Sequence, residues 1–154
     1  MDSKRLTQFI QTSMSENDIE QALKAHGYGV ISLCEDGEPY SIPVSFGFDG
    51  ECIYFPFLVS GDSTKTEYIG EGQRVRFLVT EVQNLYDWQS VSVSGCVEAI
   101  DPDSDGWDHF ITILVEQDWF DPQFEDAASI DTIEGWKLDL DDAAGMERRP
   151  FSHT

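Results

Sequence analysis

The chain has 154 residues and a mass of 17.4 kDa, enough for one domain with a sizeable core and too short for two. It carries 30 Asp and Glu against 9 Lys and Arg, a formal net charge of −21, which argues against direct nucleic-acid binding because phosphates are neutralised by many cations. Its 40% hydrophobic content is too high for a disordered chain, and no apolar run is long enough to span a bilayer.

The carboxylates are scattered along the whole chain, whereas an acidic interaction tail would concentrate them in one block. They indicate a folded domain with a carboxylate-rich surface, whose self-repulsion is tolerable when molar salt shortens the Debye length to about 3 Å. We therefore expect a protein adapted to a high-salt cytoplasm. The first residues, MDSKRLTQFIQTS, lack the apolar centre of a secretory signal, which also favours the cytoplasm.

The N-terminal region is predicted to be helical. A helical pattern at Leu6, Phe9 and Ile10 is followed by a start signal at Ser15, with Asp18 three residues later as a weak form of the capping box. Gly27 provides a C-terminal stop. The expected buried face of this helix contains Ile19, Ala22 and Leu23.

Five strands are predicted next, over about residues 28–35, 39–48, 51–58, 74–82 and 89–100. Asp36-Gly37 and Asp49-Gly50 separate the first three, and Asp-Gly between alternating apolar runs is a strong hairpin signal. In the middle strand the two faces are occupied by Tyr40, Ile42, Val44, Phe46 and Phe48, and by Ser41, Pro43, Ser45 and Gly47.

Helices are predicted at about 63–70 and, after Asp101-Pro102, around residues 107–115, where apolar residues recur at helical spacing. The polar segment 116–130 is expected to be an exposed connection. GWKLDLD supplies a sixth strand, and AAGMERRPFSHT is expected to form an extended, less ordered tail. Six largely antiparallel strands with helices at the ends indicate a small barrel, although an open sheet covered by helices on one face fits the periodicity as well.

Lys65 is the candidate for binding an anion. It lies in Gly61-Asp62-Ser63-Thr64-Lys65-Thr66, where the first turn of a helix would offer backbone N–H groups, hydroxyls and one cation to a phosphate. Ordinary N-capping beside a solvated lysine explains the same residues. Arg74 and Arg76 are the nearest other cations in the sequence, and a polar outer face is the alternative explanation for them.

The strand after Trp88 and Gln89 has one face of small residues, Ser90, Ser92, Ser94 and Cys96, opposite a face of valines. Such a face leaves room for a flat ligand or for close packing between subunits. Cys34, Cys52 and Cys96 lack metal or redox spacing and are interpreted as buried apolar side chains. The three histidines are equally dispersed, so a metal site is not expected. The Gly-x-Ser-x-Gly elbow of hydrolases is missing.

The order Gly-Tyr-Gly-Val-Ile-Ser-Leu, Asp-Gly-Glu-Pro-Tyr-Ser-Ile-Pro-Val-Ser-Phe, Ile-Tyr-Phe, Thr-Lys, Arg-Val-Arg-Phe and Trp-Gln-Ser-Val-Ser-Val-Ser-Gly-Cys-Val-Glu resembles the pyridoxamine 5'-phosphate oxidase-like FMN-binding split barrels. Within that family it is similar to the nitroimidazole-resistance and flavin-reductase-like branch. The resemblance covers about residues 20–100 and extends to WKLDLDDAAGMERRP. With the acidic composition it suggests a haloarchaeal source.

The resemblance implies a mainly β (α+β) fold, a six-stranded antiparallel split β-barrel with peripheral helices. Residues 1–154 would form one FMN-binding domain, with a core over about 20–141 and a tail over 142–154. It also implies a homodimer with FMN between the subunits. The residues expected around the cofactor are Pro43, Val44, Ser45, Tyr54 and Phe55, then Thr64, Lys65 and Thr66 on the phosphate, and Trp88, Gln89 and Ser90 from the same or the partner subunit.

Two departures limit what the resemblance implies. Pro56 stands where many nitroimidazole-resistance-like members have a His. Arg148-Arg149-Pro150 only weakly resembles the arginine-rich substrate motif of the pyridoxamine 5'-phosphate oxidases. We therefore expect an FMN-dependent oxidoreductase with a small-molecule substrate or electron donor, and not an enzyme of vitamin B6 synthesis. The alternatives are a non-catalytic flavin or haem carrier or sensor, and a deazaflavin-dependent reductase. No catalytic residue is assigned.

Overall fold

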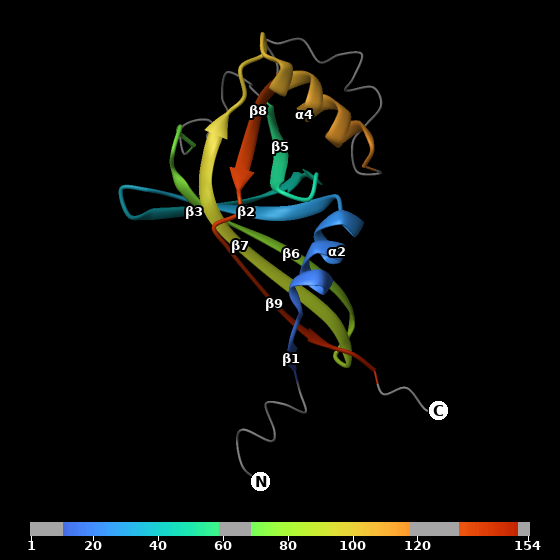
Figure 1. Cartoon of the computed structure of the whole chain (residues 1–154). Coiled ribbons are helices and arrows are strands. Elements are labelled where there is room, and N and C mark those ends of the chain that lie inside the picture. The colour runs from blue at the N-terminus through green and yellow to red at the C-terminus, as the bar shows by residue number, and fades with distance from the viewer. Residues whose placement is uncertain (1–10, 59–68, 118–132, 151–154) are drawn as a thin grey trace.

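The computed structural model follows the predicted order of strands and helices (Figure 1). It describes residues 11–58, 69–117 and 133–150. The elements in these ranges are β1 (Thr12–Ser13), α2 (Glu16–Ala25), β2 (Tyr28–Glu35), β3 (Glu38–Ser45), β4 (Gly47–Phe48), β5 (Cys52–Leu58), β6 (Arg74–Asn84), β7 (Asp87–Ala99), α4 (Asp105–Val115), β8 (Ile133–Asp139) and β9 (Asp142–Arg148).

The strands form one curled antiparallel sheet in the order β3-β2-β6-β7-β8-β5-β4. The two ends of this order are consecutive in the chain, because β3 runs into β4 through Phe46, whose N–H donates to the carbonyl of Gly27. The sheet therefore bends back on itself as a half-barrel, which confirms the mainly β split-barrel prediction. Below the half-barrel, the long β6–β7 hairpin extends with β9 and β1 beside it (Figure 1).

Strands β8 and β9 lie end to end along the same edge of β7. β8 pairs with Val97–Ala99, and β9 pairs with Trp88–Ser94. The chain shifts register between them, opposite Gly95, where a Cβ atom would collide with the carbonyl oxygen of Asp139. A glycine is therefore required in β7 at the point where its neighbouring strand changes from β8 to β9.

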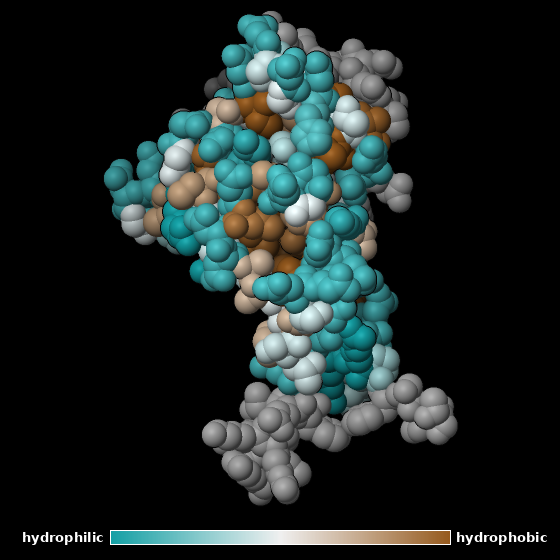
Figure 2. All heavy atoms as spheres, viewed as in Figure 1, coloured by the Kyte–Doolittle hydropathy of each residue, from teal (hydrophilic) through white to brown (hydrophobic). Residues whose placement is uncertain are grey.

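Side chains pointing inward from the sheet form the main core. It includes Ile31, Leu33, Ile42, Val44, Phe46, Ile53, Phe55, Phe57, Phe77, Val79, Val91, Val93, Val97 and Leu138. A second cluster lies under α4 and contains Cys52, Tyr54, Phe110, Leu114 and Ile133. Figure 2 shows hydrophilic side chains over most of one face of the molecule, as the composition requires.

The two helices begin close to the predicted positions. The Ser15 hydroxyl accepts the N–H of Asp18 at 3.1 Å and caps α2, whose inner face is Ile19, Ala22 and Leu23. α2 ends at Ala25, two residues before Gly27. α4 begins at Asp105 and buries Phe110 and Leu114. Within the described ranges, neither helix is long and apolar enough to cross a membrane.

The hairpin turns are confirmed, but the predicted count of six strands is too low. Asp36 and Gly37 both adopt positive φ, as a type I′ turn requires, and Asp49 and Gly50 link β4 to β5. The predicted strand 39–48 is divided at Phe46 into β3 and β4, and the short β1 was not predicted. Residues Asp142–Arg148 of the expected tail instead form β9. The predicted helical pattern at 6–10, the helix over 63–68 and most of 116–130 lie outside the described residues.

Candidate functional site

Strand alternation separates the residues predicted around a cofactor on β3 and β5. Val44 and Phe55 point into the core and are 7% and 0% exposed, so their side chains cannot touch a ligand outside the barrel. Pro43 is exposed and Ser45 half-buried on the opposite, outer face of β3. Val44 could therefore contact a ligand on this outer face only through its main chain.

Tyr54 faces α4, where it belongs to a hydrogen-bonded cluster around Asp49. Its hydroxyl donates to Asp49 Oδ2 at 3.1 Å, and His109 Nε2 lies 2.9 Å from the same oxygen. Asp49 Oδ1 accepts the backbone N–H groups of Glu51 and Cys52, both at 2.8 Å. This carboxylate therefore closes the β4–β5 turn and attaches α4 to the half-barrel.

Asp49 makes stability depend on pH. Burial alone would raise the pKa of its carboxyl, but hydrogen bonds from Cys52, His109, Glu51 and Tyr54 outweigh burial and lower the pKa from 3.8 to about 2. Because the pKa of the Asp49 carboxyl is lower in the folded than in the unfolded protein, the ionised carboxylate stabilises the fold at pH values above about 4. This contribution is lost as the pH falls from about 4 towards 2.

We expect Asp49→Asn to lower the free energy of unfolding by about 1–2 kcal/mol at pH 7 and to flatten its decline between about pH 4 and 2. Urea unfolding in molar KCl across this range measures the effect, with Asp142→Asn, at an exposed position of β9, as the control. Equal acid sensitivity of wild type and Asp49→Asn would contradict this role.

Cys52, beside this cluster, is not a nucleophile. Its thiol donates to Asp139 Oδ1 at 2.8 Å, and burial together with this hydrogen bond raises the pKa of Cys52 to about 12. The prediction of buried cysteines holds for Cys52, whereas Cys34 is exposed and Cys96 is half-buried. In the described part of the chain, no cluster of His, Cys, Asp and Glu could hold a metal ion.

The outer face of the sheet is lined by small and weakly polar residues. One row across five strands consists of Pro43, Val30, Leu78, Ser92 and Ala144. In the next row Arg76 donates to Ser92 at 3.0 Å, and Arg74 contacts Asp141 at 3.1 Å and Ser94 at 3.3 Å. These arginines support the β7 serines and face away from the core, as their polar-face interpretation predicts.

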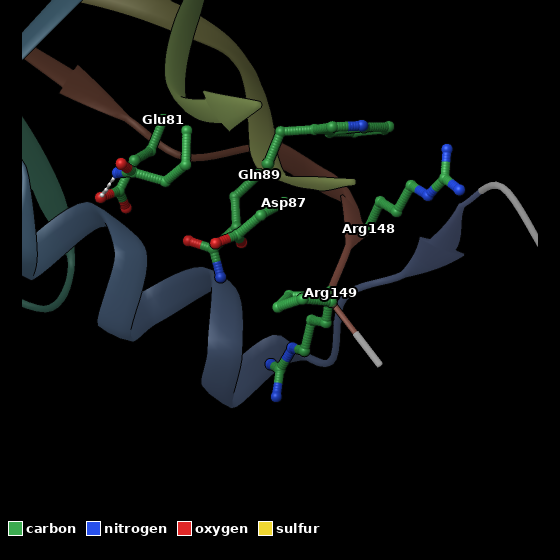
Figure 3. A pocket seen from close by; sticks show the side chains of 8 residues that line it. Glu81, Asp87, Gln89, Arg148 and Arg149 are labelled. Atoms are coloured by element: carbon green, nitrogen blue, oxygen red, sulfur yellow. Dashed lines mark hydrogen bonds between the residues drawn. The ribbon is translucent and has the colours of Figure 1, made fainter. Parts of the chain in front are cut away.

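A hollow of about 560 Å³ lies at the far end of the β6–β7 hairpin, next to α2 (Figure 3). Trp88 and Gln89, two of the predicted cofactor residues, line it. Its other lining residues are Glu81, Gln83, Asp87, Arg148, Arg149 and Pro150. Trp88 lies opposite Arg148, and Gln89 lies between Glu81 and Glu147 on the neighbouring strands. Ser90, the third predicted residue of this segment, faces the outer side with Ser92.

Most charged side chains of the hollow already have partners. Arg149 Nε lies 3.0 Å from Glu147 and its Nη2 lies 3.4 Å from Asp18, and the first of these contacts raises the pKa of Arg149. Arg148 stacks over the ring of Tyr86 at 4.5 Å. Glu81 contacts His26 at 3.3 Å. Among the residues that the structure describes, the lining is therefore close to charge-balanced and has no unpaired cationic cluster.

The predicted cofactor residues thus fall into three places within one chain. The outer face carries Pro43, Ser45 and Ser90, and Tyr54 lies under α4. Gln89 lines the hollow from the α2 side of β7, and Trp88 lines it from the side that it shares with Ser90. Thr64, Lys65 and Thr66 lie outside the described residues, so their phosphate role stays a prediction. Sequence reasoning missed Glu81, Asp87, Glu147 and Arg149. Residues 142–148, DAAGMER, show no apolar–polar alternation, so local sequence carries no signal that β9 is a strand.

Comparisons with known proteins agree with this fold. The chain matches the family model described as pyridoxamine 5'-phosphate oxidase over residues 15–147. No curated protein matches it significantly. The FAD-binding protein of Mesorhizobium loti superimposes with a TM-score of 0.68 at 23% identity, over 90% of this chain and 98% of that one.

Two mycobacterial structures are also similar. The FAD-binding protein of Mycobacterium smegmatis gives a TM-score of 0.66 at 15% identity, covering 92% of this chain and 100% of that one. The FAD- and haem-binding protein of the same organism gives 0.68 at 17% identity, covering 94% and 77%. At these identities the likeness concerns the fold, whereas the family model spans most of the sequence. The chain belongs to the pyridoxamine 5'-phosphate oxidase family.

Proposed function

We propose that this protein binds a flavin, with FMN as the cofactor, and acts as an oxidoreductase on a small-molecule substrate. The observation that carries the proposal is the hollow beside Trp88 and Gln89 in a chain of this family. Similar structures from Mesorhizobium loti and Mycobacterium smegmatis are flavin-binding proteins, which supports extending flavin binding to this chain.

The residues of the hollow fit a flavin ring. About 560 Å³ lies within the range of small-molecule sites, Trp88 offers an aromatic side chain, and Gln89 offers an amide that can both donate and accept. A bound flavin supplies the redox chemistry, while the protein binds and orients it and tunes its electrostatics. In our proposal Lys65, Thr64 and Thr66 hold the phosphate.

We also propose a homodimer in which each cofactor is held by both subunits. Within one chain Pro43 and Ser45 face the outer side of the sheet, whereas Gln89 faces α2, so these residues do not meet around one ligand. A two-fold related copy can bring the hollow of one subunit to the outer face of the other. The half-exposed apolar side chains of Tyr28 and Leu78 on that outer face support this arrangement.

We place this dimer in a high-salt cytoplasm, on the strength of the net charge of −21. Haem has less support than flavin, since Pro56 stands where many nitroimidazole-resistance-like members have a histidine. A deazaflavin coenzyme is anionic as well, so the lysine alone does not distinguish it from FMN.

Addition of FMN to the protein in molar KCl is expected to give bound-flavin absorption near 375 and 450 nm, the usual bands of oxidised flavin, with about one flavin per subunit. Lys65→Ala should weaken FMN binding about tenfold or more, because a charge-assisted hydrogen bond to the phosphate is lost, and should leave riboflavin binding unchanged. Equilibrium dialysis of both flavins measures this.

Lys24→Ala removes an exposed lysine of α2 and serves as the control. Unchanged FMN affinity in Lys65→Ala would refute the phosphate role, and a protein that takes up no flavin would refute the proposed function. Bound flavin that no donor reduces would support the non-catalytic carrier over the oxidoreductase.

A further inference from the structure

Glu147 is a buried carboxylate directly behind the hollow. It is 6% exposed and lies opposite Gln89 in the β7–β9 pairing. Its Oε2 accepts the Gln89 side-chain N–H at 3.2 Å, and its Oε1 lies 3.0 Å from Arg149 Nε. The Glu147 carboxylate is therefore held by Gln89 on one side and by Arg149 on the other. Arg149 Nη2 in turn lies 3.4 Å from Asp18 of α2.

This contact decides which way the Gln89 amide faces. An ionised carboxylate can only accept hydrogen bonds, so Gln89 must turn its NH2 group towards Glu147. The carbonyl Oε1 and the second N–H of the amide then remain for another molecule. Within the described residues, no donor is hydrogen-bonded to this Oε1.

The surroundings of Gln89 favour an uncharged ligand edge that can donate a hydrogen bond. Glu81 lies on its other side and Asp87 lines the same hollow, and these carboxylates repel a phosphate. Arg149 is engaged by Glu147 and Asp18, and Arg148 by Tyr86. A planar ring with an N–H next to a carbonyl would match the Oε1 and the free N–H of Gln89.

We propose that Glu147 is a positioning residue, which fixes the Gln89 amide so that its Oε1 accepts the N–H of an imide ring. In a flavin this group is N3–H, and a neighbouring ring carbonyl accepts the remaining Gln89 N–H. The inference rests on the proposed function, because it assigns the flavin's pyrimidine edge to the hollow and leaves the phosphate to a different part of the site.

The test compares FMN with N3-methyl-FMN, which lacks the imide N–H. Dissociation constants in molar KCl are measured by fluorescence for the wild type, Glu147→Gln, Gln89→Leu and Glu38→Gln. We expect the wild type to bind FMN about tenfold or more tightly than the methylated form, because the buried acceptor loses its donor. Glu147→Gln and Gln89→Leu should bring the ratio towards one.

Glu38→Gln is the control, since Glu38 is an exposed carboxylate at the tip of the β2–β3 hairpin and does not line the hollow. Its ratio should stay at the wild-type value. A wild-type ratio in folded Glu147→Gln overturns the positioning role. If that variant does not fold, Gln89→Leu decides, and a ratio kept there overturns the inference.

Failure of the inference and failure of the proposed function give different results. A wild type that binds FMN and N3-methyl-FMN equally well refutes only the assignment of the imide edge to Gln89. A wild type that binds neither flavin refutes flavin binding itself, and the inference with it.

Discussion

Transfer from molar KCl into about 10 mM salt is expected to unfold this protein. Two unit charges about 20 Å apart in water repel by about 0.2 kcal/mol without screening, and 21 uncompensated charges make about 200 such pairs. Part of this repulsion remains in the unfolded chain, but the excess in the folded state is comparable to a stability of about 5–15 kcal/mol. In molar salt the Debye length of about 3 Å removes most of it.

Circular dichroism during stepwise dialysis measures this loss. A matched variant neutralises three exposed carboxylates at the β2–β3 hairpin tip, Glu35→Gln, Asp36→Asn and Glu38→Gln, and should unfold at a lower salt concentration than the wild type. Sucrose added at low salt is a control for general exclusion of a solute from the surface. A protein equally stable at both salt concentrations would show that its surface charges are tolerated without screening.

The parts of the fold that depend on local chemistry could be predicted from the sequence. Asp36-Gly37 supplies the positive φ values of the β2–β3 turn, and Ser15 caps α2, so both elements begin where these residues stand. The break at Phe46 could not be predicted, because the apolar alternation continues through it from Val44 to Phe48. It is defined by a hydrogen bond to Gly27, which is distant in sequence.

Strand β9, by contrast, could not be predicted from local sequence. Ala143, Ala144 and Gly145 have low strand propensity, so the segment was expected to be a less ordered tail. Pairing with β7 and β1 nevertheless makes it a strand, and Gly145 allows Met14 and Ile19 to pack closely against it. Tertiary pairing overrides local preference here.

The residues of the candidate site likewise divide into those that the sequence indicates and those that only the fold brings together. Trp88 and Gln89 were predicted and do line the hollow, but Glu147 lies 58 residues from Gln89 in the sequence, and only the strand register brings the two together. On β3 and β5, strand alternation turns the side chains of Val44 and Phe55 into the core, so only the main chain at these positions could contact a ligand on the outer face.

Phe77 is the residue whose truncation should be most costly to the half-barrel. It is fully buried, and its ring lies 5.1 Å from that of Phe46, edge to face, and 6.2 Å from that of Phe55. Phe77→Ala is expected to lower the free energy of unfolding by about 3–5 kcal/mol, through lost burial and the cavity left behind. Leu85→Ala, at a side chain 69% exposed on the β6–β7 turn, should change it by less than about 0.5 kcal/mol.

Gly29 tests whether the ring of Phe77 is packed as described. A Cβ atom at Gly29 would overlap Phe77 Cε1 and approach the carbonyl oxygen of Leu78 to 3.0 Å, so Gly29→Ala alone should destabilise the fold. In Phe77→Leu the ring edge is gone, and the double variant should lose less than the two single variants together, by about 0.5–3 kcal/mol. Urea unfolding in molar KCl of the four proteins gives this coupling. If the losses of unfolding free energy in the two single variants simply add up in the double variant, the ring of Phe77 can move aside. The outer face of β2 and β6 would then have a less rigid support than the proposed subunit contact requires.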